Sequence, residues 1–141
     1  MQSKPIFDLL AGGGIFLLDQ QSKRMVQARA TALSLPLRIP FKIHTVIHHE
    51  RIYRHAGGQV LLVLLWLIAL ASTIVLYQGG TWFQSPLPLC GMAVALGSAA
   101  SNLFDILRRR HIVNFIDLGW WPAFNLADVG IIVGLFIAFL T

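Results

Sequence analysis

Charged residues are scarce in this sequence. Only 12% of its 141 residues are Asp, Glu, Lys or Arg, against roughly 25% in an average soluble protein. Cys90 is the single cysteine, so no disulfide can form within the chain. No low-complexity tract is present either, which excludes the collagen-like and disordered classes. With 56% hydrophobic residues, the composition predicts a membrane protein.

Long apolar segments are what the sequence has in place of charge. Segment 59–77 contains no charged residue, and about 20 apolar residues suffice to cross a hydrocarbon core roughly 30 Å thick. The first apolar segment is shorter, contains Asp8 and is followed by no small-residue cleavage site, so we favour a retained helix over a cleaved signal peptide. We predict an all-α membrane protein, a single domain over 1–141, with four transmembrane helices at about 5–19, 59–77, 87–107 and 124–141.

The intervening segment 20–58 is polar and basic, and its β-forming residues predict a small β-containing surface segment between the first two helices. It also contains a cluster of histidines. His44 and His48 are spaced i, i+4, and Glu50 or His55 could add a third ligand, as in open zinc sites. There is no HExxH pattern and no second cysteine. We therefore favour solvated imidazoles, with His49 among them, and expect no metal and no cofactor.

Carboxylates within apolar segments are costly and are functional candidates by default. Asp128 lies near the start of the last apolar segment without a basic neighbour in sequence. Asp105 lies near the end of the third, with Asn102 on the same helical face. Asp19 and Lys23 are spaced i, i+4 and can pair. We favour a structural role for Asp19 and Lys23 and a functional role for Asp128.

Four sequence motifs carry a resemblance to a known family. Leu17–Lys23 reads LLDQQSK, Gly97–Asp105 reads GSAASNLFD, His111–Asp117 reads HIVNFID, and Pro122–Asp128 reads PAFNLAD. Together they closely resemble signal peptidase II, the bacterial membrane aspartyl peptidases that remove the signal peptide from lipidated prolipoproteins. The resemblance implies a multi-pass protein of the bacterial inner (cytoplasmic) membrane, whose partners are membrane lipid and a transmembrane helix or lipoprotein signal peptide.

The same resemblance assigns roles to individual residues. The family has two catalytic aspartates, one in a V-D-F context and one in the FNLAD context. Asp128 matches the second, whereas the first falls on Asn114. A carboxylate pair works by sharing a proton, and a neutral amide cannot act as a base near neutral pH. The further motif residues that the resemblance implies are Asp19, Lys23, Asn102, Asp105 and Asn125.

Further departures from the family pattern accompany Asn114. Ser101 stands where the family has Gly, Ile106 where it has Arg, and Arg110 where it has Gly. The family's Asn-x-Gly-Ala-Ala-Phe motif is not recognisable in 49–58. Neither Asp117 nor Asp105 is spaced to replace the missing aspartate.

Because of these departures, we predict a non-catalytic relative of the family rather than an enzyme. Such a pseudoenzyme would bind a transmembrane or lipidated partner, or act as an accessory subunit of a larger membrane complex. The alternative is an active prolipoprotein signal peptidase in which Asp128 works with an unusual partner.

The basic residues leave the membrane orientation open. Seven of the eleven Lys and Arg lie in 20–58 and three in 108–110. The positive-inside rule would place these two connections in the cytoplasm, whereas the family topology places them outside, and we favour the family topology. The basic stretches lie between apolar segments rather than on one soluble face, so no nucleic-acid partner is expected.

Overall fold

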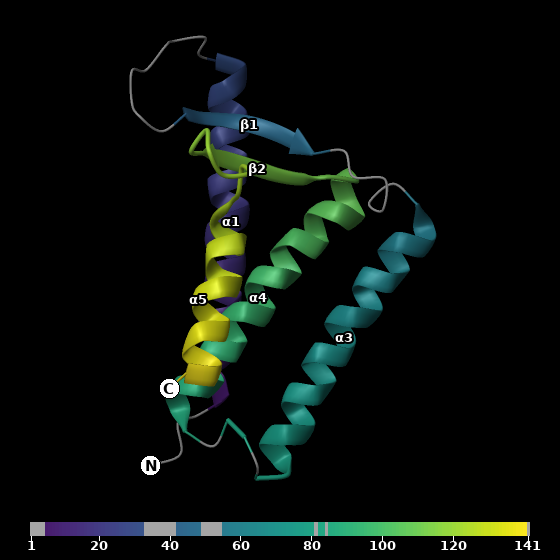
Figure 1. Cartoon of the computed structure of the whole chain (residues 1–141), viewed down its shortest axis with the longest axis vertical. Helices are drawn as coiled ribbons and strands as arrows, with labels where there is room; N and C mark the ends of the chain where they lie inside the picture. Colours follow the sequence, from purple (N-terminus) through teal and green to yellow (C-terminus); the bar gives the residue numbers. More distant parts are fainter. Residues whose placement is uncertain (1–4, 33–41, 49–54, 81, 84, 141) are drawn as a thin grey trace.

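The computed structural model of the chain describes residues 5–32, 42–48, 55–80, 82–83 and 85–140. The elements follow in the order α1 (Pro5–Ala32), β1 (Lys42–His48), α3 (Ala56–Gln78), α4 (Pro86–Arg109), β2 (Ile112–Asp117) and α5 (Leu126–Leu140). The helices extend along the long axis of the molecule, and the two strands cross one end of it (Figure 1). The start of α1 and the end of α5 both lie at the opposite end (Figure 1).

Local sequence signals set the limits of α4. Ser85, at the N-cap, has an extended backbone conformation, and Pro86 follows in the first turn, where its missing N–H costs nothing. The helix ends at Arg110, whose left-handed φ of 64° turns the chain out of the helix. The N–H of Arg110 donates to the carbonyl of Ile106 at 3.0 Å. This turn leads directly into β2.

Small residues bring α4 into backbone contact with α1 and α5, its two most extensive partners. A Cβ on Gly12 of α1 would lie 2.7 Å from the carbonyl oxygen of Ala93, and a Cβ on Gly97 would run into the backbone of Gly12. On the other side of α4, a Cβ on Gly91 would lie 2.7 Å from the carbonyl oxygen of Gly134. Helices in membranes associate closely through such residues, and here they fix the spacing of α1, α4 and α5.

The described chain is mostly helical, and two of its helices, α3 and α4, are long and apolar enough to cross a membrane. The most apolar window of α3 buries none of its residues against the rest of the described chain, whereas a third of the corresponding window of α4 is buried. α5 is apolar but, at 15 residues, shorter. The predicted four helices are therefore present, with two of them meeting the length and composition of a membrane span.

The first helix differs from its predicted limits. The membrane span is predicted to end near residue 19, whereas the helix itself continues to Ala32 and takes in the start of the segment 20–58. The physical reason is that polar residues of this stretch are buried against α4 rather than solvated. Gln20 and Lys23 are 5% and 0% exposed, so their polarity marks a packed polar interface and not the end of a helix.

The two strands pair in antiparallel fashion, and β1 falls within 20–58. The register places Val46 opposite Asn114 and His48 opposite Ile112, with an irregularity between Ile43 and Val46. Within β2, the backbone of Ile116 also bridges to Phe124. This bridge folds the chain back so that the residues just before α5 lie against β2.

Candidate active site

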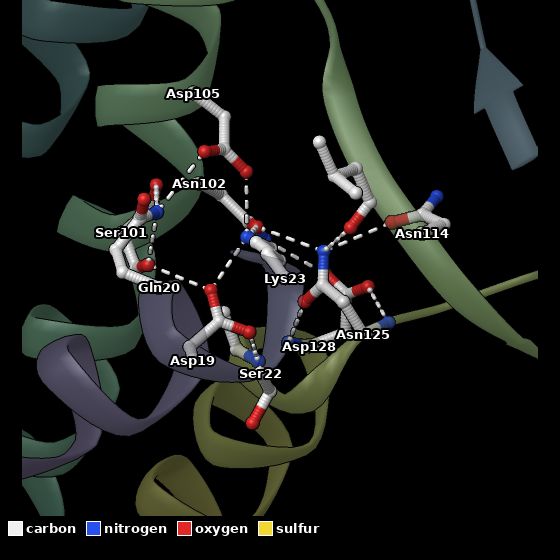
Figure 2. Close-up of polar contacts among 12 residues, drawn as sticks. Asp19, Gln20, Ser22, Lys23, Ser101, Asn102, Asp105, Asn114, Asn125 and Asp128 are labelled. Atoms are coloured by element: carbon white, nitrogen blue, oxygen red, sulfur yellow. Dashed lines mark hydrogen bonds and ion pairs between the residues drawn. The ribbon is translucent and has the colours of Figure 1, made fainter. Parts of the chain in front are cut away.

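Four charged side chains form a cluster between α1 and α4, and Figure 2 shows the three that are fully buried, Asp19, Lys23 and Asp105. Lys23 Nζ lies 2.5 Å from Asp19 Oδ2 and 2.6 Å from Asp105 Oδ2. Arg109 Nη1 lies 2.6 Å from Asp105 Oδ1. The side chains of Asp19, Lys23 and Asp105 are fully buried, and that of Arg109 is 20% exposed. Two positive and two negative charges alternate, so the cluster carries no net charge and no buried ion is left without a counterion.

Gln20 and Ser101 supply the hydrogen bonds that surround this cluster. Gln20 Nε2 donates to Ser101 Oγ at 2.9 Å and to Asp105 Oδ1 at 3.0 Å. The Ser101 hydroxyl donates to Asp19 Oδ2 at 2.6 Å. The other oxygen of Asp19 accepts the backbone N–H of Ala127 at 2.9 Å. Asp19 therefore joins the charged cluster to the first turn of α5, which is where Asp128 lies.

Asn125 and Asp128 form a reciprocal cap at the start of α5. The Asp128 N–H donates to Asn125 Oδ1, and the Asn125 N–H donates to Asp128 Oδ2, each at 3.0 Å. This is the arrangement of a capping box, with a side chain at the N-cap and one three residues later satisfying each other's backbone N–H. The FNLAD motif therefore has a structural function, and that function holds the Asp128 carboxylate in a fixed position.

Asn102 connects the charged cluster to Asp128. Lys23 Nζ donates to Asn102 Oδ1 at 3.0 Å, and Asn102 Nδ2 donates to Asp128 Oδ1 at 2.9 Å. Both oxygens of Asp128 therefore accept an N–H hydrogen bond. Asp128 is only half-buried, in contrast to the fully buried aspartates of the cluster. It is the least buried aspartate of the network.

Asn114, on β2, lies on the other side of Asn125 from the charged cluster (Figure 2). Its Oδ1 accepts a hydrogen bond from Asn125 Nδ2 at 2.9 Å. The same Asn125 nitrogen donates to Asn102 Oδ1 at 3.0 Å and lies 3.3 Å from the carbonyl of Val113. Asn125 is fully buried and thus joins α4, β2 and α5. All seven residues that the motifs single out, including Asn114, are brought together.

The other carboxylates weighed as replacements for the missing aspartate are engaged elsewhere. Asp105 is fully buried between Lys23 and Arg109. Asp117 Oδ1 accepts the N–H of Gly119 at 2.8 Å in the turn after β2. Among the described residues, neither Asp105 nor Asp117 therefore replaces the missing aspartate as a partner of Asp128.

The histidine cluster is only partly visible. His49 and Glu50 lie outside the described residues, and His55 is at the N-cap of α3. Within the ranges that the structure describes, no group of three or more His, Cys, Asp or Glu side chains is placed to hold a metal ion.

Three members of the network were missed by sequence reasoning. Arg109 could have been found, because it is four residues after Asp105, the spacing that predicts the Asp19–Lys23 pair. Ser101 lies four residues before Asp105 and thus on the same helical face, but it was read as a departure from the family pattern. Gln20 carries no comparable signal, since only tertiary packing places its amide against Ser101.

Comparisons with solved structures identify the fold. Two solved structures of a bacterial membrane enzyme, determined by the in meso method, superpose on the chain with TM-scores of 0.72 and 0.74. Each covers 95% of this chain, and the chain covers 85% and 90% of theirs, at 18% sequence identity. The fold is therefore that of a bacterial membrane enzyme.

The family follows from the sequence comparisons. A family model for signal peptidase (SPase) II matches residues 13–141. Lipoprotein signal peptidases of Moorella thermoacetica and Pseudomonas aeruginosa are each 32% identical, over 87% and 85% of this chain and 83% and 78% of their own lengths. A relative from Rhodococcus jostii is 39% identical, over only 39% of its own length. The chain belongs to the signal peptidase II family.

These findings correct the prediction of a non-catalytic partner-binding protein. The two relatives that the chain matches over 83% and 78% of their own lengths are named lipoprotein signal peptidases. No comparison points to an accessory subunit, a pseudoenzyme or a larger complex. The prediction was wrong because it counted each departure from the motif as a loss of function. In the structure, Ser101 is an integral member of the network and Asn114 is hydrogen-bonded within it.

Proposed function

We propose that the chain is an active prolipoprotein signal peptidase, an endopeptidase in which Asp128 is the catalytic carboxylate. The observation that carries the proposal is the position of Asp128. It is half-buried at the start of α5 and held by Asn102 and Asn125, and a charge-balanced, mostly buried cluster lies behind it. A preorganised carboxylate of this kind can accept a proton from water as the water attacks a peptide carbonyl.

The substrate class follows from family membership and from the surface of the chain. The relatives are lipoprotein signal peptidases, and most of the apolar residues of α3 are exposed or only partly buried. A lipid-embedded helical segment would meet this surface without leaving the bilayer. We therefore infer that the substrate is a lipidated prolipoprotein and that membrane lipid surrounds the helices.

The test of this proposal is cleavage of a diacylglyceryl-modified prolipoprotein by the purified chain. Asp128→Asn should reduce turnover on the order of 10²–10⁴-fold, the usual contribution of a general base. The amide can still accept the Asn125 N–H, so the start of α5 keeps its cap. Asp117→Asn is the matched control, because Asp117 lies at the end of β2, where its Oδ1 accepts the N–H of Gly119. Equal turnover by Asp128→Asn and the wild-type chain would refute the assignment.

All four helices are proposed to cross the inner membrane, with the strand-bearing end on the outer face. In this topology both ends of the described chain are cytoplasmic (Figure 1). The opposite orientation, which charge counting favours, would place the site in the cytoplasm.

Single cysteines in a Cys90→Ser background distinguish the two orientations. Ala28 and Gln78 are exposed positions near the end of α1 and at the end of α3, at opposite ends of the bundle. An impermeant thiol reagent applied to intact cells should label Ala28→Cys and not Gln78→Cys. The reverse pattern would exclude cleavage on the outer face.

A further inference from the structure

The three consecutive arginines at the end of α4 have different surroundings. Arg109 faces inward, where its guanidinium pairs with Asp105 at 2.6 Å. Arg108 and Arg110 are exposed instead, and neither forms an ion pair within the part of the chain that the structure describes. α4 has the length and composition of a membrane span, and it ends at Arg109, beside the strands (Figure 1). Two unpaired positive charges therefore lie at the end of a helix that can cross a membrane.

The Arg108 side chain lies against apolar surface. Its guanidinium carbon is 5.8 Å from the centre of the Phe104 ring, one turn earlier on α4, a contact that attracts a cation to an aromatic face. Phe104 in turn makes an edge contact with Phe16 of α1, with ring centres 5.8 Å apart. Leu107, next to Arg108, is exposed. A positive charge thus borders aromatic and aliphatic surface, as a phospholipid headgroup borders its acyl chains.

Arg110 has a backbone conformation that favours glycine. Its φ is 64° at the C-cap of α4, in the left-handed region that strains any residue with a Cβ. Its N–H donates to the carbonyl of Ile106 at 3.0 Å, a hydrogen bond that glycine would make equally well. The backbone therefore gives no reason for an arginine here. Strained residues cluster at functional sites, which points to a function for this exposed side chain outside the fold.

We propose that Arg108 and Arg110 bind the phosphate of an anionic phospholipid, whose acyl chain lies along Phe104 and Leu107. The charged cluster beside them carries no net charge, so it leaves the two arginines available to an anion. A guanidinium matches the geometry of a phosphate and forms paired hydrogen bonds with it. In the proposed topology this lipid belongs to the outer leaflet. The inference goes beyond the proposed function, because it concerns the lipid around the protein and not the substrate.

This lipid site also accounts for the location of the three arginines. The positive-inside rule would place 108–110 in the cytoplasm, whereas the proposed topology places them outside. Arg109 is the counterion of a fully buried carboxylate of α4, and the other two arginines gain an anionic partner from the bilayer. All three then have a reason to be on the outer face that is independent of how the chain is oriented during insertion.

The experiment measures thermal unfolding of the purified full chain in nonionic detergent micelles with increasing amounts of phosphatidylglycerol or phosphatidylcholine. A ligand that binds the folded chain raises Tm with its concentration, which yields an apparent affinity for each lipid. The wild-type chain should prefer phosphatidylglycerol. Arg108→Gln and Arg110→Gly should each weaken that binding about fivefold, the usual contribution of one basic side chain near an anionic surface. Arg29→Gln, at an exposed arginine in the last turn of α1, is the matched control and should leave the affinity unchanged.

Arg110→Gly separates a lipid site from a structural role. In detergent without added lipid, this variant should unfold at a higher temperature than the wild type, because glycine adopts the left-handed conformation without strain. A lower Tm would mean that the arginine side chain supports the fold itself, and the inference would be wrong. Because Arg110→Gly is decisive by itself, the test stands even if Arg108→Gln fails to fold.

Three further outcomes would overturn the lipid site. The first is an equal wild-type affinity for the two lipids. The second is a loss of affinity in Arg29→Gln as large as that in Arg110→Gly, which would indicate a general attraction between charges. The third is an equal rise in Tm with inorganic phosphate in place of lipid, which would exclude a contribution from the acyl chain.

Discussion

α3 and the other three helices are held by different kinds of contact. α1, α4 and α5 meet through backbone contacts at glycine and through the buried charged network. Between α3 and α4, Trp66 Nε1 donates a hydrogen bond to the carbonyl of Leu96 at 3.0 Å, and most apolar residues of α3 are exposed or only partly buried. The three-helix unit positions the hydrogen-bonded network around Asp128, and α3 presents an apolar surface beside it. Under the proposed function, the first would hold the catalytic carboxylate in place and the second would face the lipid in which the substrate is embedded.

The largest effect should come from breaking the charged cluster. Lys23→Met removes the cation that faces Asp19, Asp105 and Asn102 and leaves buried carboxylates without it. Loss of one partner of a buried pair typically costs about 3–5 kcal/mol. Denaturant unfolding in detergent micelles measures this cost. Arg24→Met is the matched control, because Arg24 is the exposed neighbour of Lys23, and a Lys23→Met chain as stable as that control would show that the cluster does not hold the unit together.

A smaller effect should follow from separating α1 and α4. Gly97→Ala places a methyl group into the backbone of Gly12, and overpacking of this kind costs about 1–3 kcal/mol. Gly13→Ala provides the opposite case within the same region, because no described atom lies within 4 Å of its Cβ position. That variant should gain up to about 1 kcal/mol, since alanine favours a helix over glycine. Equal unfolding midpoints for the two variants would contradict the close approach.

The smallest effect is expected at α3. Trp66→Phe keeps an aromatic ring but removes the indole N–H that reaches Leu96, which should cost about 1 kcal/mol or less. Leu65→Phe, at the exposed neighbouring position, controls for the change of aromatic content in the lipid-facing surface. If Trp66→Phe destabilises the chain as much as Lys23→Met, then α3 belongs to the same cooperative unit as the other helices.

The sequence was informative where local spacing carries the structure. The i, i+4 spacing of Asp19 and Lys23 predicts the ion pair that forms, and the uncharged stretch of α3 predicts a helix that could span a membrane. The FNLAD motif predicted a functional carboxylate at Asp128, but not that Asn125 and Asp128 also cap α5.

Sequence reasoning failed where tertiary contacts change the meaning of a residue. The extension of α1 beyond residue 19 depends on burial of Gln20 and Lys23 against α4, which no local pattern reveals. The contacts of Asn114 were missed for a related reason. A substitution that removes a carboxylate reads as a loss, whereas the fixed direction of its amide becomes visible only once Asn125, Lys23 and the Asp128 N–H are placed around it.

The charged cluster also bears on how the protein is made. Asp19 and Lys23 are paired one turn apart on α1, and Asp105 and Arg109 are paired one turn apart on α4. Each helix therefore carries both signs at this level before it meets the other. The bridge between Lys23 and Asp105 forms only when the two helices come together. With all four helices crossing the membrane as proposed, α1 and α4 can each enter the bilayer as a locally neutral segment, and the site is completed by their assembly.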